Sequence, residues 1–375
     1  MKRTRRPARL LALLAAVASL AAIPAAASAS VNWVVHGRGF GHGVGMSAYG
    51  AYGYAQHGKG YRFILGHYYT GTTVGSFEKA RSIRVLLGAS SGDVGFSGAT
   101  SACRTKLDPA RNYEAHRIGN AVRLRSSGGK LLAKCGAKLR AAGAGQITIS
   151  GYGAFRGALE AVPSGGSLDV VNALALEQYA KGVMANEVPP SWPTEELKAQ
   201  AVAVRSIALT SDVGGSLFDV YNDTRSQVYK GLESEYTTTN AAVEATRGQV
   251  LLYQGQVAQA LYSACSGGHT ESAVNVFGYA VPYLVGVNDP YDDACPLHTW
   301  TLNFSGPEIS SRLSAYLNGK LKQVVITKTG TSPRIISAKL IGTGGTTTVS
   351  GGELESALGG YDTWMTFEKV TSSKR

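Results

Sequence analysis

Glu187 is the residue of this chain whose type and setting best suit acid–base chemistry. It stands in the run 186–190, NEVPP, directly after a segment with helical apolar periodicity. The residue before a proline is pushed to extended geometry, so Glu187 should lie where a helix gives way to a stiff turn. A carboxyl group buried at such a joint can act as a general acid. The alternative is a structural carboxylate that caps the helix end or pairs with Lys198 or Arg205.

Two amphipathic segments must position this glutamate. Residues 176–183 carry apolar side chains at helical spacing, and a second helix is predicted from Thr194 as its N-cap, with acidic residues in its first turn. Lys198 and Arg205 are seven residues apart. At about 100° per residue, both lie on one side of the second helix, at the edge of its apolar stripe. We expect that side to face the wall of a cleft.

The second informative stretch is the loop 36–47, HGRGFGHGVGMS, with glycine at every second position from 37 to 45. Glycine permits positive φ and close backbone approach, so amides of this loop can face a ligand. His42 could donate a hydrogen bond to a bound sugar, or it is a structural hydrogen-bonding residue. A dinucleotide fingerprint is rejected, because the preceding buried strand and the following acidic residue are missing. Residues 46–56 are predicted to form a helix, followed by an apolar segment at 63–69.

Residues 1–29 are predicted to be a signal peptide. Five cations precede an apolar run at 10–23, which is too short to serve as a membrane anchor, and Ala27-Ser28-Ala29 fits a cleavage site. We therefore expect a secreted, cell-wall protein without a transmembrane anchor. Without those five of its 37 Lys and Arg residues, and with 25 acidic residues, the chain carries a net charge of +7. This modest excess suits an anionic wall or membrane surface better than nucleic acid.

Four cysteines remain beyond residue 29, an even number that favours two disulfides in an oxidising compartment. Of three connectivities, we expect the local one, which pairs Cys103 with Cys135 and Cys265 with Cys295. Zinc is the competing interpretation, because His269 and His298 follow the second pair at ligand-like spacing. The 47 glycines, frequent Val, Ile and Thr runs and few long helical patterns predict an α+β fold, with small mixed or antiparallel sheets and a few helices around a cleft.

Ser266, in the stretch 266–271, SGGHTE, suggests a serine hydrolase at first sight. It lacks the glycine-x-serine-x-glycine elbow, and no base partner can be identified in the sequence, so a glycine-rich turn is favoured.

The residue pattern of these stretches closely resembles that of the SpoIID/LytB family, which comprises stage II sporulation protein D and amidase-enhancer-like proteins. The resemblance covers most of residues 33–370. The matching residues of the glutamate module are Leu176, Glu177, Tyr179, Gly182, Val183, Glu187, Pro189, Trp192, Leu197 to Ala201, Ala203 and Arg205. Further matches are the loop from Gly37 to Ser47, the ending Tyr68 to Thr72, the signature Ser226-Gln227-x-Tyr229-x-Gly231 and the serine-glycine-glycine turn at 266.

This resemblance implies a peptidoglycan lytic transglycosylase, which cleaves between N-acetylmuramic acid and N-acetylglucosamine and leaves a 1,6-anhydro end. Glu187 would be its single catalytic acid and base. The second reading is a non-catalytic, wall-binding enhancer of an N-acetylmuramoyl-L-alanine amidase, and the third is a hydrolase that leaves reducing ends. The implied partners are glycan strands and, in the second reading, the amidase. The implied substrate-binding residues are His42, Lys198, Gln200, Arg205, Gln227, Tyr229, Ser266, Gly267 and His269.

Some members of the family hold zinc just upstream of the matched glutamine. Asp223, Thr224 and Arg225 stand there in this chain, so no metal or other cofactor is predicted.

The order of the motifs differs from that of the family. The glycine-histidine loop, residues 30–80, precedes the core at 81–375 instead of following it, and 348–367 resembles the segment that normally leads into the loop. We interpret this as a circular permutation, which requires the two ends of the chain to lie close together. Within the core, the glutamate module spans about 168–300, and 100–144 is a variable loop.

Overall fold

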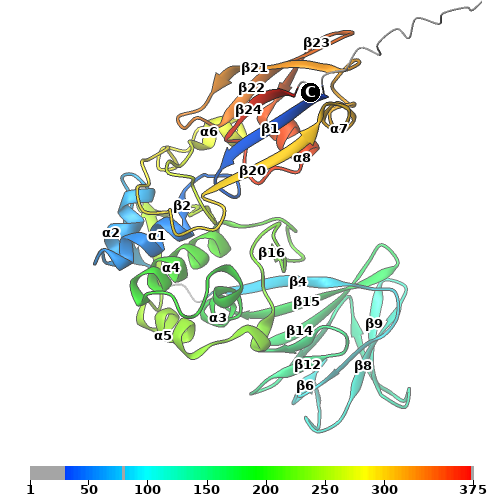
Figure 1. Cartoon of the computed structure of the whole chain (residues 1–375). Helices are drawn as coiled ribbons and strands as arrows, with labels where there is room; N and C mark the ends of the chain where they lie inside the picture. Colours follow the sequence, from blue (N-terminus) through cyan, green and yellow to red (C-terminus); the bar gives the residue numbers. More distant parts are fainter. Residues whose placement is uncertain (1–29, 78–80, 373–375) are drawn as a thin grey trace, which may run out of the picture.

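The computed structural model describes residues 30–77 and 81–372. The predicted signal peptide, 1–29, lies outside these residues. The described chain combines helices with small, mostly antiparallel sheets, so the predicted α+β class is confirmed (Figure 1). None of its helices in the described part is long and apolar enough to cross a membrane.

Two sheets form the lower body in Figure 1. One has the order β16-β4-β15-β14-β11-β6-β7, with β4 (Ser82–Ser90), β6 (Ser101–Ala102), β7 (Thr105–Lys106), β11 (Leu139–Ala142), β14 (Ala158–Ser164), β15 (Ser167–Ala175) and β16 (Val220–Tyr221). The other has the order β10-β9-β8-β5-β12-β13, with β5 (Val94–Ser97), β8 (Tyr113–Ile118), β9 (Ala121–Ser126), β10 (Leu131–Gly136), β12 (Ile147–Ile149) and β13 (Gly153–Phe155). Residues alternate between buried and exposed along these strands. The buried side chains of both sheets form one hydrophobic core.

Helices pack between this body and the rest of the molecule (Figure 1). They are α1 (Ala48–Gln56), α2 (Tyr61–Tyr68), α3 (Leu176–Glu187), α4 (Thr194–Thr210), η1 (Gly231–Ser234) and α5 (Thr237–Ala245). Short strands accompany them: β2 (Met46–Ser47), β3 (Thr73–Ser76), β17 (Gln249–Tyr253), β18 (Gln256–Val257) and β19 (Tyr262–Ser263). Helix α4 contributes to two clusters, one with α3 and the sheets and one with α1 and α2, so it is the central element of the glutamate module.

A third unit contains both ends of the described chain. Its elements are β1 (Ser30–Arg38), β20 (Thr299–Ser305), α7 (Gly306–Arg312), β21 (Leu321–Thr329), β22 (Ile335–Gly342), β23 (Gly345–Ser350), α8 (Gly351–Leu358) and β24 (Met365–Ser372). Strand β1 lies between β20 and β24, and a second sheet β21-β22-β23 completes a separate core. Helix α6 (Ala273–Phe277) lies on the connection to this unit.

Strands β1 and β24 are antiparallel neighbours, with Ser30 opposite Ser372. A hairpin turn could therefore join the two ends, which is the arrangement that the permutation hypothesis requires. The permutation itself stays a prediction.

Both expected disulfides are present. Cys103 is bonded to Cys135, and Cys265 to Cys295. The cysteine sulfurs are thus not available to zinc, and the described residues contain no group of three or more His, Cys, Asp or Glu side chains placed to hold a metal ion.

Several predicted boundaries were wrong by one or two residues. Helix α4 is capped by Pro193 and includes Thr194 as its first residue. Proline suits a helix start because its missing N–H has no intrahelical partner there, so the expected threonine cap is not needed. Met46 and Ser47 are not helical but pair in parallel with Tyr262 and Ser263, and Ser47 caps α1.

Arg205 lies in the core, contrary to the expectation that it faces a cleft. Its side chain is fully buried, and its Nε and Nη2 donate to the carboxylate of Glu177 at 3.0 and 2.6 Å. The remaining donors reach the carbonyls of Ala201 and Val243 and the hydroxyl of Thr246. The guanidinium is therefore fully engaged, and it ties α4 to α3 and α5.

Replacing Arg205 by alanine should lower the free energy of unfolding by about 3–5 kcal/mol, because the buried Glu177 carboxylate loses its cation and a cavity opens. The exposed Arg247, which pairs with Glu244, provides the matched control. Arg247→Ala should cost about 0–1 kcal/mol. Urea unfolding of both variants measures the difference, and equal midpoints would contradict the structural role given to Arg205.

Candidate active site

Glu187 is the last residue of α3, and the chain turns there as the following prolines require. Val188 is extended, with φ −139° and ψ 147°. The carboxylate oxygen Oε1 accepts a 2.7 Å hydrogen bond from the backbone N–H of Val228. Neither cation of the alternative interpretation reaches it, because Lys198 pairs with Glu195 and Arg205 with Glu177. Glu187 is therefore held by a loop amide and has no basic partner among the described residues.

A hydrogen-bonded chain of buried side chains lies behind Glu187. Tyr179 donates its hydroxyl to Oε1 of Gln227 at 3.1 Å, and Nε2 of Gln227 donates to the hydroxyl of Tyr262 at 2.9 Å. The Tyr262 hydroxyl in turn interacts with the carboxyl group of Glu187. Gln227 donates the proton in its hydrogen bond to Tyr262. The hydroxyl proton of Tyr262 therefore remains available to Glu187.

Burial raises the pKa of Glu187 above its ordinary value. The hydrogen bonds from Val228 and Tyr262 act in the opposite direction, because they favour the charged form, but burial is the larger effect. With no cation to stabilise the carboxylate, the protonated acid persists to higher pH than in an exposed glutamate. That is the property required of a general acid near neutral pH.

Glu187 lines a cleft of about 500 Å³. The glycine-histidine loop contributes 40–42 to its walls, α4 contributes Ile207, and other parts of the wall come from 224–226 and 261–264. Glu187 is the only carboxyl group among the described lining residues. The cleft therefore brings together the two stretches that the sequence singled out, Glu187 and the loop of His42, although they are far apart in the chain.

His42 is neutral at physiological pH. Burial, followed by the nearby Arg334, lowers its pKa to about 4, while a contact with the backbone of Tyr262 acts weakly in the opposite direction. The N–H of Val44 donates to Nδ1 of the ring at 3.0 Å, so the proton of the neutral imidazole is on Nε2. His42 thus adds no positive charge to the cleft.

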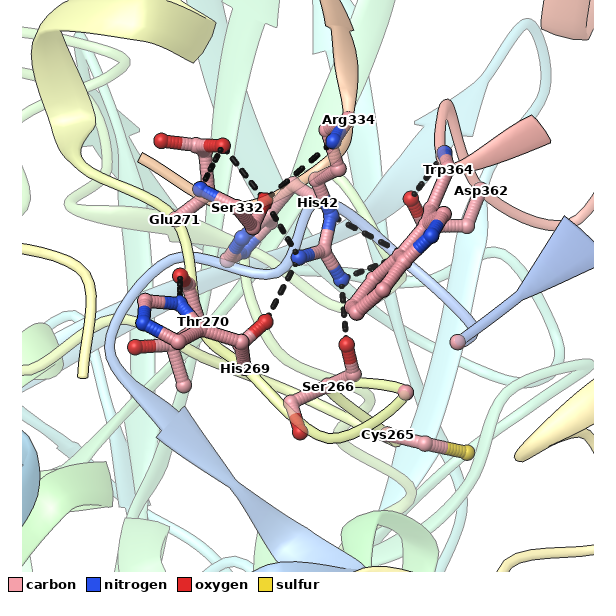
Figure 2. A network of polar contacts seen from close by, with 12 residues as sticks. His42, Cys265, Ser266, His269, Thr270, Glu271, Ser332, Arg334, Asp362 and Trp364 are labelled. Carbon is pink, nitrogen blue, oxygen red and sulfur yellow. Dashed lines mark hydrogen bonds and ion pairs between the residues drawn. The ribbon is translucent and has the colours of Figure 1, made fainter. Parts of the chain in front are cut away.

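A buried ion pair holds the His42 loop in place, as Figure 2 shows. Arg334 donates from Nη2 to Asp362 at 2.7 Å and to the carbonyl of Ser266 at 2.8 Å, and from Nη1 to the carbonyl of His269 at 2.8 Å. The loop passes so close that a Cβ on Gly39 would lie 2.6 Å from the Asp362 carboxylate. Gly39 also has a φ of +84°, so two constraints demand glycine at this position.

Ser266, Gly267 and His269 belong to this support and do not line the cleft. The Ser266 hydroxyl lies 2.7 Å from Asp289 and 3.0 Å from Asp292, and the amide of Gly267 donates to Asp292. His269 Nδ1 bonds to the carbonyl of Thr270. Ser266 is thus buried between two carboxylates, an arrangement that fits a structural turn better than a nucleophile.

The other predicted binding residues also lie away from the described cleft lining. Lys198 is on the first turns of α4 with Glu195. Gln200 is fully buried, and its amide, like the carboxyl group of Glu196 one turn earlier, has no hydrogen-bond partner among the described residues. Tyr229 donates to Asn172 at 2.6 Å and stacks on Tyr179. Their predicted contacts with substrate stay predictions, whereas Gln227 touches the site through Tyr262.

Sequence reasoning missed Tyr262 and the Arg334–Asp362 pair. Tyr262 lies in no motif that the sequence singled out, and its position depends on the pairing of β19 with β2. Arg334 carries no local motif, since its partners come from three separate segments.

Comparison with known proteins finds relatives of the part of the chain that contains Glu187. Residues 164–253, which include Glu187, Gln227 and Tyr229, match the family model described as "SpoIID: Stage II sporulation protein". An uncharacterised protein of Brachyspira hyodysenteriae is 43% identical over 173 residues, which is 45% of this chain and 46% of that protein.

Two relatives from Bacillus subtilis have descriptive names. The amidase enhancer is 42% identical over 132 residues, covering 35% of this chain and 18% of the relative. Stage II sporulation protein D is 30% identical over 206 residues, covering 50% and 59%. The chain thus spans less than two thirds of each of these relatives. The matched region, residues 164–253, contains the glutamate module, and over it the chain carries a domain similar to that of stage II sporulation protein D and the amidase enhancer.

Proposed function

We propose that this protein is a secreted peptidoglycan lytic transglycosylase, which cleaves the bond between N-acetylmuramic acid and N-acetylglucosamine. The observation that carries the proposal is Glu187, a single buried carboxyl group with a raised pKa in the wall of a cleft. Hydrolytic glycosidases ordinarily use two carboxylates. With one carboxyl group among the described lining residues, this cleft fits a reaction in which the substrate provides its own nucleophile.

In the first step, protonated Glu187 donates its proton to the glycosidic oxygen. The bond from that oxygen to C1 of the muramic acid breaks, and positive charge develops on C1 and the ring oxygen. The neutral state of His42 matters here, because a second positive charge beside the ring would oppose this transition state. Arg334 is the nearest buried cation to the loop, and Asp362 compensates its charge.

In the second step, the Glu187 carboxylate removes the proton from the C6 hydroxyl of the same sugar. The C6 oxygen attacks C1 and closes the 1,6-anhydro ring, and Glu187 regains the proton with which it began. Water is not consumed. A positioned acid and base of this kind supplies roughly 10²- to 10⁴-fold in rate, so precise positioning of the strand in the cleft must supply much of the remainder.

The second candidate function is enhancement of a wall amidase without catalysis. The 42% identity to the amidase enhancer of Bacillus subtilis favours it. In that case the cleft would bind glycan strands, and the burial of Glu187 would serve binding. A hydrolase that leaves reducing ends is less well supported, because the described cleft lining offers no second carboxylate to activate water.

Glu187→Gln should reduce cleavage of denuded glycan strands at least about 100-fold, because the amide cannot donate and recover the proton. Mass spectrometry of the anhydro-muramic ends measures this. Glu195→Gln is the matched control, since that glutamate lies in the first turn of α4 and outside the cleft lining. Undiminished cleavage by folded Glu187→Gln would overturn the catalytic role. Wild-type protein that is inert alone but stimulates an added amidase would support the enhancer function.

The pH profile of kcat/KM should fall on the alkaline side, tenfold per pH unit, above the raised pKa of Glu187, because only the protonated acid can begin the reaction. The bond from Tyr262 lowers that pKa, so removing it should raise the pKa further. Tyr262→Phe should therefore move the alkaline limb to higher pH, whereas Tyr236→Phe, at an exposed tyrosine, should leave it in place. A limb that moves to lower pH would contradict the assignment.

A further inference from the structure

Gly41 and His42 line a second pocket in addition to the cleft. This second pocket has a volume of about 380 Å³, within the range typical of small-ligand sites. Its other walls come from Asn275 and Val276 on α6, from the start of β22, and from α8 with Glu355. The same two loop residues border both spaces, so the second pocket adjoins the cleft at the loop of His42.

The carboxyl group of Glu355 is an unused polar group in the wall of the second pocket. It is half-buried, and no described residue forms a hydrogen bond or an ion pair with it. Burial, together with the nearby Asp362, raises its pKa to about 7, with Arg334 opposing the shift. A partly desolvated carboxyl group without a protein partner is costly unless a ligand or water bonds to it. The hydroxyl and amide groups of a sugar could do so.

Exposed aromatic rings lie next in the chain to Val276, a lining residue of the second pocket. Phe277 and Tyr279, which follow Val276, are 37% and 52% exposed and stack with their centroids 6.0 Å apart. Phe277 also packs edge-on against the ring of His42 at 5.6 Å. Grouped exposed aromatic side chains beside a cleft mark a binding surface more often than chance exposure does. Such rings can cover the apolar face of a sugar ring.

We infer that the second pocket is a further subsite for the glycan strand. It would bind an N-acetylated amino sugar of the same strand that is cleaved at Glu187. Glu355 would bond to a hydroxyl group or the acetamido N–H, and Val276 and Phe277 would contact the acetamido methyl group and the ring face. This subsite rests on the proposed glycan function, and the sugar in it would belong to the part of the strand beyond the reacting bond.

The charge of the second pocket distinguishes between the two sugars of the strand. Its described lining contains one carboxyl group and neither lysine nor arginine, and His42 is neutral. The lactyl group of muramic acid carries a carboxylate or an acidic stem peptide. The described lining offers no cation to pair with that charge, and the ionised form of Glu355 would repel it. The neutral N-acetylglucosamine is therefore the better occupant, and its recognition would fix the register of the strand at Glu187.

The test compares the affinities of a denuded tetrasaccharide and a denuded octasaccharide by calorimetry. Glu187→Gln serves as the background, so that the strands are not cleaved. The octasaccharide should bind about tenfold more tightly, which corresponds to roughly 1.4 kcal/mol from the additional contacts. Glu355→Ala and Phe277→Ala should each reduce this ratio towards one. Phe277 is surface-exposed, so its variant provides a reading even if Glu355→Ala is unstable.

Two control variants test whether a change in the ratio of octasaccharide to tetrasaccharide affinity is specific to the pocket. Glu368→Gln removes a carboxylate that is 62% exposed, and Tyr236→Ala removes a ring that is 55% exposed, both outside the described lining of the cleft and the pocket. Both should retain the tenfold ratio. An unchanged ratio in the two pocket variants, with glycan binding intact, would overturn the subsite and leave the proposed function standing. Failure of every strand to bind the folded protein would overturn both, and tighter binding only of peptide-bearing strands would assign the pocket to the stem peptide instead.

Discussion

The Arg334–Asp362 ion pair is the interaction on which the arrangement of the site depends. It is almost completely buried, and its geometry is bidentate in effect, because two guanidinium nitrogens face one carboxylate oxygen. Arg334 also binds two carbonyls of the 266–269 turn, and the glycine loop packs against both members of the pair. One charged pair thus joins the C-terminal unit, the turn and the loop of His42. The pair acts together with backbone hydrogen bonds that join Phe40 to Cys265 and Gly41 to Tyr361.

Each side of the cleft contains a buried arginine whose charge is neutralised by a carboxylate. On the side of α4, Arg205 is neutralised by Glu177, and on the side of the loop, Arg334 is neutralised by Asp362. Both arginines are therefore structural, and neither presents free charge to the cleft. Glu187 and His42 lie between them without an ionic partner, and burial drives each towards its neutral form. The cleft lining thus combines one carboxyl group and one neutral histidine with hydroxyl and amide side chains and with Arg225, whose charge is paired with Asp223.

The sequence predicted those features of the fold that depend on neighbouring residues. The position of Glu187 at a helix end follows from the prolines after it, and the disulfides are the local pairs. The glycine loop has positive φ at four of the five expected positions, whereas Gly37 is part of strand β1. Its closeness to Glu187 came from family resemblance and not from spacing.

Features that depend on tertiary contacts were not predictable. The spacing of Lys198 and Arg205 fixes the angle between them on the helix, but not what packs against it, so the burial of Arg205 beside α5 was unforeseen. Similarly, Gln227 was recognised by its motif, but its role as the link between Tyr179 and Tyr262 required the fold. Ser266 and His269 were predicted to bind substrate, whereas in the structure their carbonyls accept from Arg334 and support the glycine loop.

The central position of β1 has a consequence for how the molecule is assembled. This strand comes early in the chain, but both of its neighbours, β20 and β24, come from the last quarter of the described residues. Such long sequence separation makes the pairing slow, because the loop must close before any contact stabilises it. Until the final residues emerge, β1 has two open edges and the apolar Trp33 and Val35 uncovered, which invites intermolecular association. A nascent or truncated chain should therefore depend on chaperones as long as β1 has not paired with β24.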